Sequence, residues 1–214
     1  LKITFAVTIG ALILGVIIGL LIAVVRTAHD SRRMGKSNII LSILNAVCKL
    51  YLTVIRGTPM LVQIFLIYFA LPMVIGERIN PFVAAVAACS INSGAYVSEI
   101  FRAGIQSVDR GQMEAGRSLG LSWGQTMRYV ILPQAFKHVI PPLGNEFISM
   151  TKETSLVSVI GFEELTRRGQ LIIAKTYGSF EIWMTVAAIY LIMTLGIARL
   201  VSYLEKRFAT DDRN

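Results

Sequence analysis

The chain has 214 residues, of which 54% are hydrophobic and 16% charged, and its mean hydropathy is +0.63. Soluble domains usually carry about 25% charged residues. This deficit, together with long apolar runs, excludes an ordinary soluble domain and indicates lipid as the solvent. The net charge is +8, but the basic residues stand mostly between apolar runs, as in cytoplasmic loops, and no recognition motif favours nucleic-acid binding.

Apolar runs near the length that a bilayer requires, about 20 residues, predict an all-α integral membrane protein with a single transmembrane domain over 1–214. We expect five spanning helices, at about 5–25, 58–75, 82–100, 129–150 and 180–201. The first run has no charge and is the clearest span. Its Gly15 and Gly19 have GxxxG spacing, which allows close helix packing, although glycine is common in membrane helices generally.

Basic residues orient the first spans. The segment 26–36 has four basic residues and one acid, so we expect it to be cytoplasmic and the N-terminus to lie outside. The apolar segment 38–55 is interrupted by Lys49, and we expect it to lie along the interface before the second span. Pro59 opens that span at a position that proline tolerates.

In the second half of the chain the loops between spans continue to alternate between the two sides of the membrane. The segment 102–128 has four basic residues and two acids, so we expect a cytoplasmic loop between the third and fourth spans. The proline-rich fourth span at 129–150 and the segment 151–179 return the chain to the outer side. The last span, 180–201, then leaves the C-terminus in the cytoplasm.

Sequence signatures of catalysis are weak. Neither HExxH nor CxxC occurs, and Cys48 and Cys89 have no His or Cys at metal-ligand spacing. Residues 35–37, Gly-Lys-Ser, look like the end of a phosphate-binding loop, but Asp30 stands where that motif needs glycine. We predict no catalytic residue, metal site or cofactor in this chain, so energy for any work must come from elsewhere.

The most specific pattern is Glu114-Ala115-Gly116-Arg117-Ser118-Leu119-Gly120, followed by Val130-Ile131-Leu132-Pro133. It resembles the cytoplasmic EAA loop of bacterial ABC importer membrane subunits. That pattern is Glu-Ala-Ala, three residues, Gly, nine residues, Ile, one residue, Leu-Pro. Gly116 replaces the second Ala, at a helix cost of about 1 kcal/mol, and Val130 replaces Ile.

Further segments are similar to the polar amino-acid uptake subfamily of these importers, among them 56–63, 68–72, 95–105 and 152–156. The resemblance spans roughly 50–170. It implies a five-helix permease subunit of the bacterial cytoplasmic (inner) membrane that works by alternating access. It also implies a second permease, identical or homologous, a cytoplasmic ATPase dimer that holds ATP and Mg, and an extracytoplasmic amino-acid-binding protein.

A short cytoplasmic helix in the EAA segment is expected to couple the subunit to the ATPase. Such a helix sits in a groove of its partner through a mixed apolar and charged face, and Gly120 ends it in the left-handed conformation. The alternative is an ordinary amphipathic loop. The candidate coupling residues are Glu114, Ala115, Gly116, Ser118, Leu119 and Gly120.

Polar groups at membrane depth are costly and face protein or water. The candidates for a substrate path are Asn92, Ser93, Glu99, Asn145, Glu146, Ser149, Thr151, Glu153 and Ser155. Glu146 and Glu153 can accept from a cationic side chain, which favours a polar or basic amino acid. The alternatives are hydrogen bonds between helices, a pair of Glu99 with Arg102, and a pair of Glu153 with Lys152.

Two other classes of protein compete with this interpretation. A secondary transporter driven by an ion gradient would explain intramembrane acids, but not the EAA pattern, and it fits poorly with five spans that lack inverted repeats. A membrane enzyme is disfavoured because no nucleophile, metal or acid–base constellation is found.

Overall fold

The structure, a computed structural model, describes residues 1–32 and 38–210, and every regular element in these ranges is a helix. The tripeptide 35–37 lies outside the described residues. In chain order the elements are α1 (Lys2–Arg32), α2 (Ile39–Gly57), α3 (Met60–Phe65), η1 (Leu66–Ala70), α4 (Leu71–Ile75), α5 (Pro81–Gln106), α6 (Arg110–Ser118), α7 (Trp123–Thr126), η2 (Met127–Ile131), α8 (Leu132–Glu153), η3 (Thr154–Ile160), α9 (Leu165–Thr176) and α10 (Ser179–Thr210).

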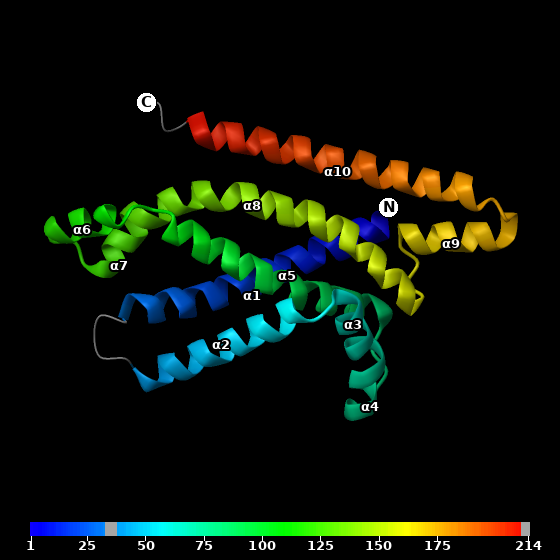
Figure 1. Cartoon of the computed structure of the whole chain (residues 1–214), viewed down its shortest axis with the longest axis horizontal. Helices are drawn as coiled ribbons and strands as arrows, with labels where there is room; N and C mark the ends of the chain where they lie inside the picture. The colour runs from blue at the N-terminus through cyan, green and yellow to red at the C-terminus, as the bar shows by residue number, and fades with distance from the viewer. Residues whose placement is uncertain (33–37, 211–214) are drawn as a thin grey trace.

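The long helices α1, α2, α5, α8 and α10 run along the long axis of the molecule, each opposite in direction to the one before it (Figure 1). α6 and α7 lie at one end, and the C-terminal end of α10 points the same way. The N-terminal end of α1 and the helix α9 lie toward the other end, while α3, η1 and α4 turn aside from the axis. The chain therefore alternates between two ends of an elongated bundle.

The number of apolar spans differs from the prediction. Four helices of the described residues are long and apolar enough to cross a membrane, namely α1, α2, α5 and α10. The predicted span over 58–75 is wrong, because Thr58 and Pro59 are extended and the apolar helix that follows, Met60–Ile75, is shorter than a spanning helix. The candidate span in this part of the chain is instead α2, which is apolar enough to cross a membrane although it contains Lys49 and Arg56.

The predicted fourth span, 129–150, corresponds to η2 and α8, which the structure joins end to end. The 22 residues of α8 reach about 33 Å at a rise of 1.5 Å per residue. α8 is nevertheless too polar to count among the apolar spans. It packs on both α5 and α10, and Ala135, Val139, Met150 and Thr151 are its buried residues.

Both π-helical turns stand directly before a proline. η1 precedes Pro72 and η2 precedes Pro133, each at the second position of the next helix. Proline has no amide hydrogen, and its ring clashes with the carbonyl four residues earlier. A wider π turn accommodates that carbonyl, so the chain stays helical through each proline.

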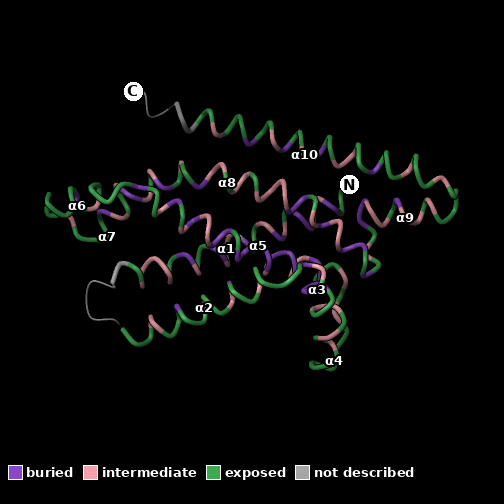
Figure 2. Tube along the Cα trace, in the orientation of Figure 1, coloured by how far each residue is buried: buried purple, intermediate pink, exposed green. Residues whose placement is uncertain are grey.

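Glycines allow α1 and α5 to form the most extensive helix pair of the bundle. A Cβ at Gly19 would lie 2.6 Å from Val97 Cγ1, and one at Gly94 would lie 2.7 Å from Ile18 Cγ2. The close packing predicted from the GxxxG spacing is confirmed. The buried residues follow this pair, whereas α2 and α10 are exposed over most of their length (Figure 2).

We predict that Gly19→Ala destabilises the protein, because its methyl group would meet the side chain of Val97 and the backbone nitrogen of Ser98, 2.9 Å away. Overpacking of this kind lowers the free energy of unfolding by about 1–3 kcal/mol. Gly10→Ala is the matched control, since its Cβ would be 3.6 Å from the nearest atom. The measurement is the thermal unfolding midpoint in lipid nanodiscs, and equal midpoints for the two variants would contradict the packing argument.

Candidate functional site

A chain of buried polar groups joins α3 to α5. The Asn92 amide donates to Gln63 Oε1 at 2.9 Å, and both side chains are buried. Gln63 Nε2 donates in turn to the carbonyl oxygens of Ile55, at 2.8 Å, and Thr58, at 3.1 Å. These carbonyls have no helical donor because α2 ends at Gly57. Gln63 was not among the predicted site residues, although a polar residue inside an apolar run was a signal for it.

A second polar contact joins α5 to α8. Ser93 Oγ donates to Glu146 Oε1 at 2.7 Å. Asn145, Ser149 and Glu153 follow one another at intervals of four residues on α8, with Glu146 beside them. Residues at this spacing lie on one side of a helix. The structure thus brings Ser93 to Glu146 and aligns three further candidates along the same side of α8.

The remaining α8 candidates have different surroundings. The buried Thr151 hydroxyl donates to the carbonyl of Phe147 at 2.8 Å, so it is engaged within its own helix. Ser155 is half-buried in η3. Within the described residues no salt bridge within 4.0 Å joins Glu153 to Lys152, and the attraction between their charges acts over a longer distance.

Glu99 lies apart from Ser93 and Glu146, toward α1. Its carboxylate forms an ion pair with Arg26, while the nearest nitrogen of Arg102 is 3.9 Å away. Arg102 instead donates to Asp30 at 3.1 Å. The pair of Glu99 with Arg102 is therefore the weaker contact, and Arg26 is the main partner from a helix distant in sequence.

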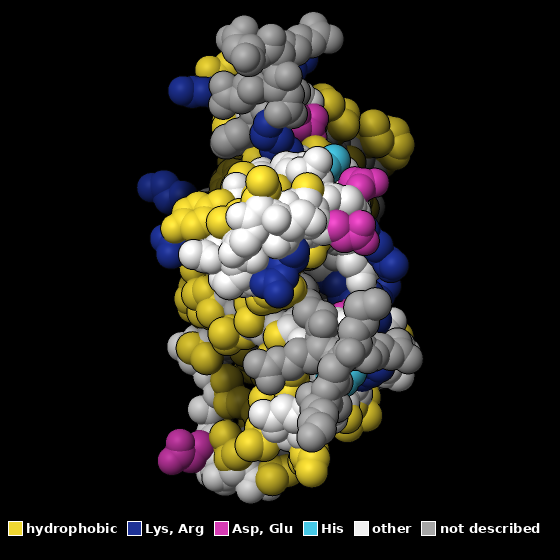
Figure 3. All heavy atoms as spheres, turned by 90° about the vertical axis from the view of Figure 1, so that its left-hand side faces the viewer, with side chains coloured by type: hydrophobic (Ala, Val, Ile, Leu, Met, Phe, Trp, Pro, Cys, Tyr) yellow, Lys and Arg dark blue, Asp and Glu magenta, His cyan; other side chains and the backbone are white. Residues whose placement is uncertain are grey.

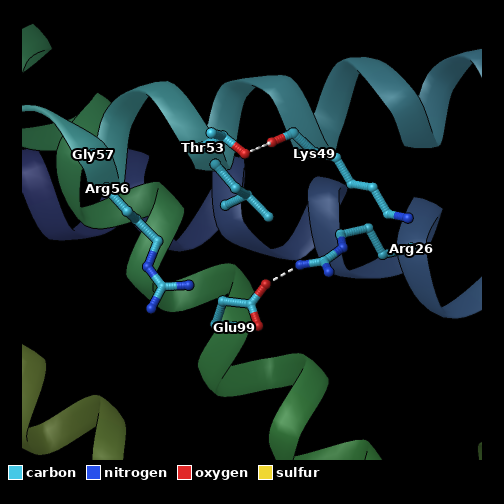
Figure 4. A pocket seen from close by; sticks show the side chains of 7 residues that line it. Arg26, Lys49, Thr53, Arg56, Gly57 and Glu99 are labelled. Atoms are coloured by element: carbon cyan, nitrogen blue, oxygen red, sulfur yellow. Dashed lines mark hydrogen bonds and ion pairs between the residues drawn. The ribbon is translucent and has the colours of Figure 1, made fainter.

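A pocket of about 530 Å³ opens beside Glu99, between α1, α2 and α5 (Figure 4). The Arg26–Glu99 pair forms one part of its wall, and Lys49 and Arg56 of α2 form another. The guanidinium of Arg56 lies 5.6 Å from the centroid of the Tyr96 ring, within the range of a cation–π contact.

The predicted EAA helix is present as α6. The Asp109 carboxylate accepts from the Gly111 amide at 2.6 Å and caps its first turn. The helix ends at Ser118, and Gly120 follows with φ +86°. Gly120 therefore has the left-handed conformation expected after a helix end.

The surface of α6 is open except on one side. Glu114, Ala115 and Ser118 are exposed, and Leu119 is 82% exposed. The side chains of Lys and Arg are prominent at this end of the molecule (Figure 3).

Gly116 occupies the covered side of α6. A Cβ at this position would lie 2.4 Å from Thr126 Cγ2, so the alanine of the EAA pattern would not fit here. The close approach of α6 to α7 explains why the chain departs from that pattern at this residue.

Residues 116–120 also read Gly-x-Ser-x-Gly, which is the spacing of a hydrolase nucleophile elbow. That motif requires a strand followed by a sharp turn that presents the serine. Ser118 instead ends a surface helix, and no strand occurs in residues 1–32 or 38–210. Over the same ranges, no group of three or more His, Cys, Asp or Glu residues is arranged to hold a metal ion.

A bundle of apolar helices with a polar interior and an exposed surface helix at one end is typical of a membrane transport subunit. Residues 15–210 match the family described as "Binding-protein-dependent transport system inner membrane component". The match covers most of the chain, and the protein belongs to this family.

Curated relatives agree with this assignment. The chain is 46% identical to the glutamine transport system permease protein GlnP of Escherichia coli strain K12 over 207 residues, 96% of this chain and 90% of the relative. It is 42% identical to the arginine transport system permease protein ArtQ of Bacillus subtilis strain 168 over 162 residues, 76% of this chain and 74% of the relative.

Solved structures show the same fold. A crystal structure of an amino acid ABC transporter with histidines superposes with a TM-score of 0.87 at 48% identity, covering 97% of this chain and 91% of that chain. An inward-facing structure of the MetNI methionine ABC transporter has a TM-score of 0.77 at 19% identity, with 97% and 93% covered. At that identity the second likeness concerns the fold alone.

We predict that Gly116→Ala loosens the contact of α6 with α7, because the added methyl group would overlap Thr126. The local free energy of opening should fall by about 1–3 kcal/mol, and amide hydrogen exchange over residues 110–131 should become faster. Gly124→Ala is the control, since a Cβ there would meet nothing within 4 Å. The double variant Gly116→Ala/Thr126→Ala should regain slow exchange, and its failure to do so would show that the contact is not the cause.

Proposed function

We propose that this chain is the permease subunit of an ATP-binding cassette importer and forms the path of a polar amino acid through the bacterial cytoplasmic membrane. The observation that carries the proposal is the Ser93–Glu146 contact inside a bundle whose other long helices are apolar. Ionisable groups at membrane depth mark substrate paths when they face protein or a water-filled space. Relatives named for glutamine and arginine transport support a polar amino acid as substrate.

The chain itself makes and breaks no bond in this proposal. A separate cytoplasmic ATPase dimer hydrolyses ATP, and a binding protein outside the membrane delivers the amino acid. A second permease, identical or homologous, completes the path, since a symmetric pair encloses a channel along the shared axis. Family membership supports partners of this kind.

The proposed topology places α6 and the C-terminus in the cytoplasm and the N-terminus outside. The opposite positions of α6 and the start of α1 along the bundle support it (Figure 1). The cationic side chains at the α6 end support it as well (Figure 3), because cytoplasmic segments of membrane proteins carry an excess of Lys and Arg.

The proposed mechanism is alternating access. Closure of the ATPase dimer displaces α6, and the helices rock between two arrangements that open to opposite sides of the membrane. In the path, Glu146, which the Ser93 hydroxyl orients, and Glu153 accept hydrogen bonds from the ammonium group or a cationic side chain of the substrate, while the amides of Asn92 and Asn145 offer donors to its carboxylate.

The energy source separates this proposal from a transporter driven by an ion gradient. Vesicles that contain the assembled complex should take up radiolabelled amino acid when ATP is inside and all ion gradients are collapsed. Uptake that stops with the gradients and ignores ATP would support the gradient-driven alternative and reject the importer.

We predict that Glu114→Lys uncouples transport from ATP hydrolysis while the subunit stays inserted in the membrane. Glu114 is exposed on α6, so reversing its charge alters a docking contact without disturbing the bundle. Gly120→Asp should uncouple as well, because aspartate is strained at φ +86°. The measurement is the number of amino acids transported per ATP hydrolysed. Gln112→Lys adds a positive charge elsewhere on α6 and serves as the control, and wild-type coupling in both test variants would reject the role of α6.

A second prediction concerns the carboxylates of α8. Glu146→Gln and Glu153→Gln should reduce transport of cationic amino acids more than that of neutral ones, because a charge-assisted hydrogen bond becomes a neutral one. Such bonds are about twice as strong as neutral ones, so arginine transport should fall by roughly tenfold. Competing uptake of arginine and glutamine measures the ratio of their transport rates. An equal loss for both would show that the charge of these carboxylates does not select cationic amino acids.

A further inference from the structure

The helix α2 has two chemically different sides. Lys49, Thr53 and Arg56 recur at intervals of four and three residues, so they form one polar stripe. The opposite side carries large exposed apolar residues, namely Ile40, Ile43, Val47, Leu50 and Val54. The apolar side faces lipid. The side of α2 that packs on the bundle carries the buried Asn45 and Leu52, and the cationic stripe is exposed and lies between these two sides.

The stripe borders the pocket between α1, α2 and α5, where positive charge is in excess. Lys49, Arg56 and Arg26 line the pocket together with a single carboxylate, Glu99. That carboxylate is already paired with Arg26 (Figure 4). Within the described residues neither Lys49 nor Arg56 has a carboxylate partner. Two cations are therefore available to an anionic ligand.

The pocket adjoins the polar interior described above. Gly57 belongs to its wall, and the next residue, Thr58, accepts hydrogen bonds from Gln63 through its hydroxyl, at 2.9 Å, and its carbonyl. Gln63 in turn accepts a hydrogen bond from the amide of Asn92. The volume of about 530 Å³ exceeds that of one amino acid, so a substrate and several waters fit together.

We propose that this pocket is an inner vestibule site, in which Lys49 and Arg56 bind the carboxylate of the amino acid before it leaves the permease. The proposal rests on the proposed function, because it assigns a second position along the same path. A carboxylate between two cations forms charge-assisted hydrogen bonds. The ligand class is a free amino acid with an unblocked carboxylate.

The charge of the pocket also selects among amino acids. A neutral zwitterion such as glutamine gains the carboxylate contacts and brings one positive charge, its ammonium group, whereas a cationic amino acid brings two. An amino acid with a cationic side chain meets three cations and only one carboxylate, which is already engaged. The vestibule therefore favours neutral polar amino acids, whereas Glu146 and Glu153 accept cationic ones.

Inhibition by substrate on the cytoplasmic side tests the site. Proteoliposomes that hold the assembled complex are loaded with ATP and with L-glutamine, L-glutaminamide or L-arginine, and the initial uptake of radiolabelled L-glutamine is measured. Internal glutamine should slow uptake in the wild type. Glutaminamide, which lacks the carboxylate, and arginine should each need about tenfold higher concentrations, since one charge-assisted hydrogen bond contributes roughly that factor.

The variant Lys49→Gln/Arg56→Gln should raise the half-inhibitory concentration of internal glutamine by about tenfold or more. Lys49→Arg should keep it near the wild-type value, and Lys49→Glu should make arginine the better inhibitor. Lys175→Gln, at the exposed end of α9, removes a cation outside the pocket and is the matched control. Co-purification of all subunits verifies that each variant assembles.

The outcomes separate the two proposals. ATP-dependent uptake in the wild type, with the same half-inhibitory concentration in the double variant, overturns the vestibule site and leaves the proposed function intact. Wild-type uptake that internal glutamine does not slow overturns the site as well. Loss of phosphatidylglycerol binding from the double variant, with unchanged inhibition by glutamine, would assign the pocket to a lipid headgroup and reject the proposal. Absence of ATP-dependent uptake in the wild type rejects the importer itself.

Discussion

The cost of placing polar groups away from water governs this bundle. Buried polar side chains at its centre satisfy other polar groups, as Gln63 does for the carbonyls of α2 and Ser93 does for Glu146. An unsatisfied group at that depth would cost several kcal/mol. Helix breaks are therefore tolerated where a side chain supplies the missing donor, and the same requirement collects the polar residues of α3, α5 and α8 into one region.

Hydrophobic runs predicted most of the helices, because apolar length and loop charge are properties of local sequence. They failed at 58–75, where the extended backbone of Thr58 and Pro59 leaves only Met60–Ile75 as a short apolar helix. They also failed at 38–55, where Lys49 suggested an interfacial segment although the surrounding residues form an apolar helix. Composition averages over a window, whereas a helix end is decided by one or two residues.

The candidate site was predictable only in part. The conformation of Gly120 and the close packing at Gly19 follow from glycine chemistry and were predicted from spacing. The ion pair of Arg26 with Glu99 joins residues 73 apart, and no local pattern indicates such a partner. Lys49 looked like an interfacial residue, and the pocket that it shares with Arg56 appears only when α2 is placed against α1 and α5.

Because Gly116 has no side chain, α6 and α7 are in direct contact. α6 rests directly on Thr126, and from Trp123 to Glu153 the chain is helical without interruption through α7, η2 and α8. In the proposed mechanism, a displacement of α6 passes by direct contact to this continuous helical segment, which carries Glu146. Any extra volume at residue 116 would separate α6 from Thr126 and so remove the direct contact through which α6 acts on that segment.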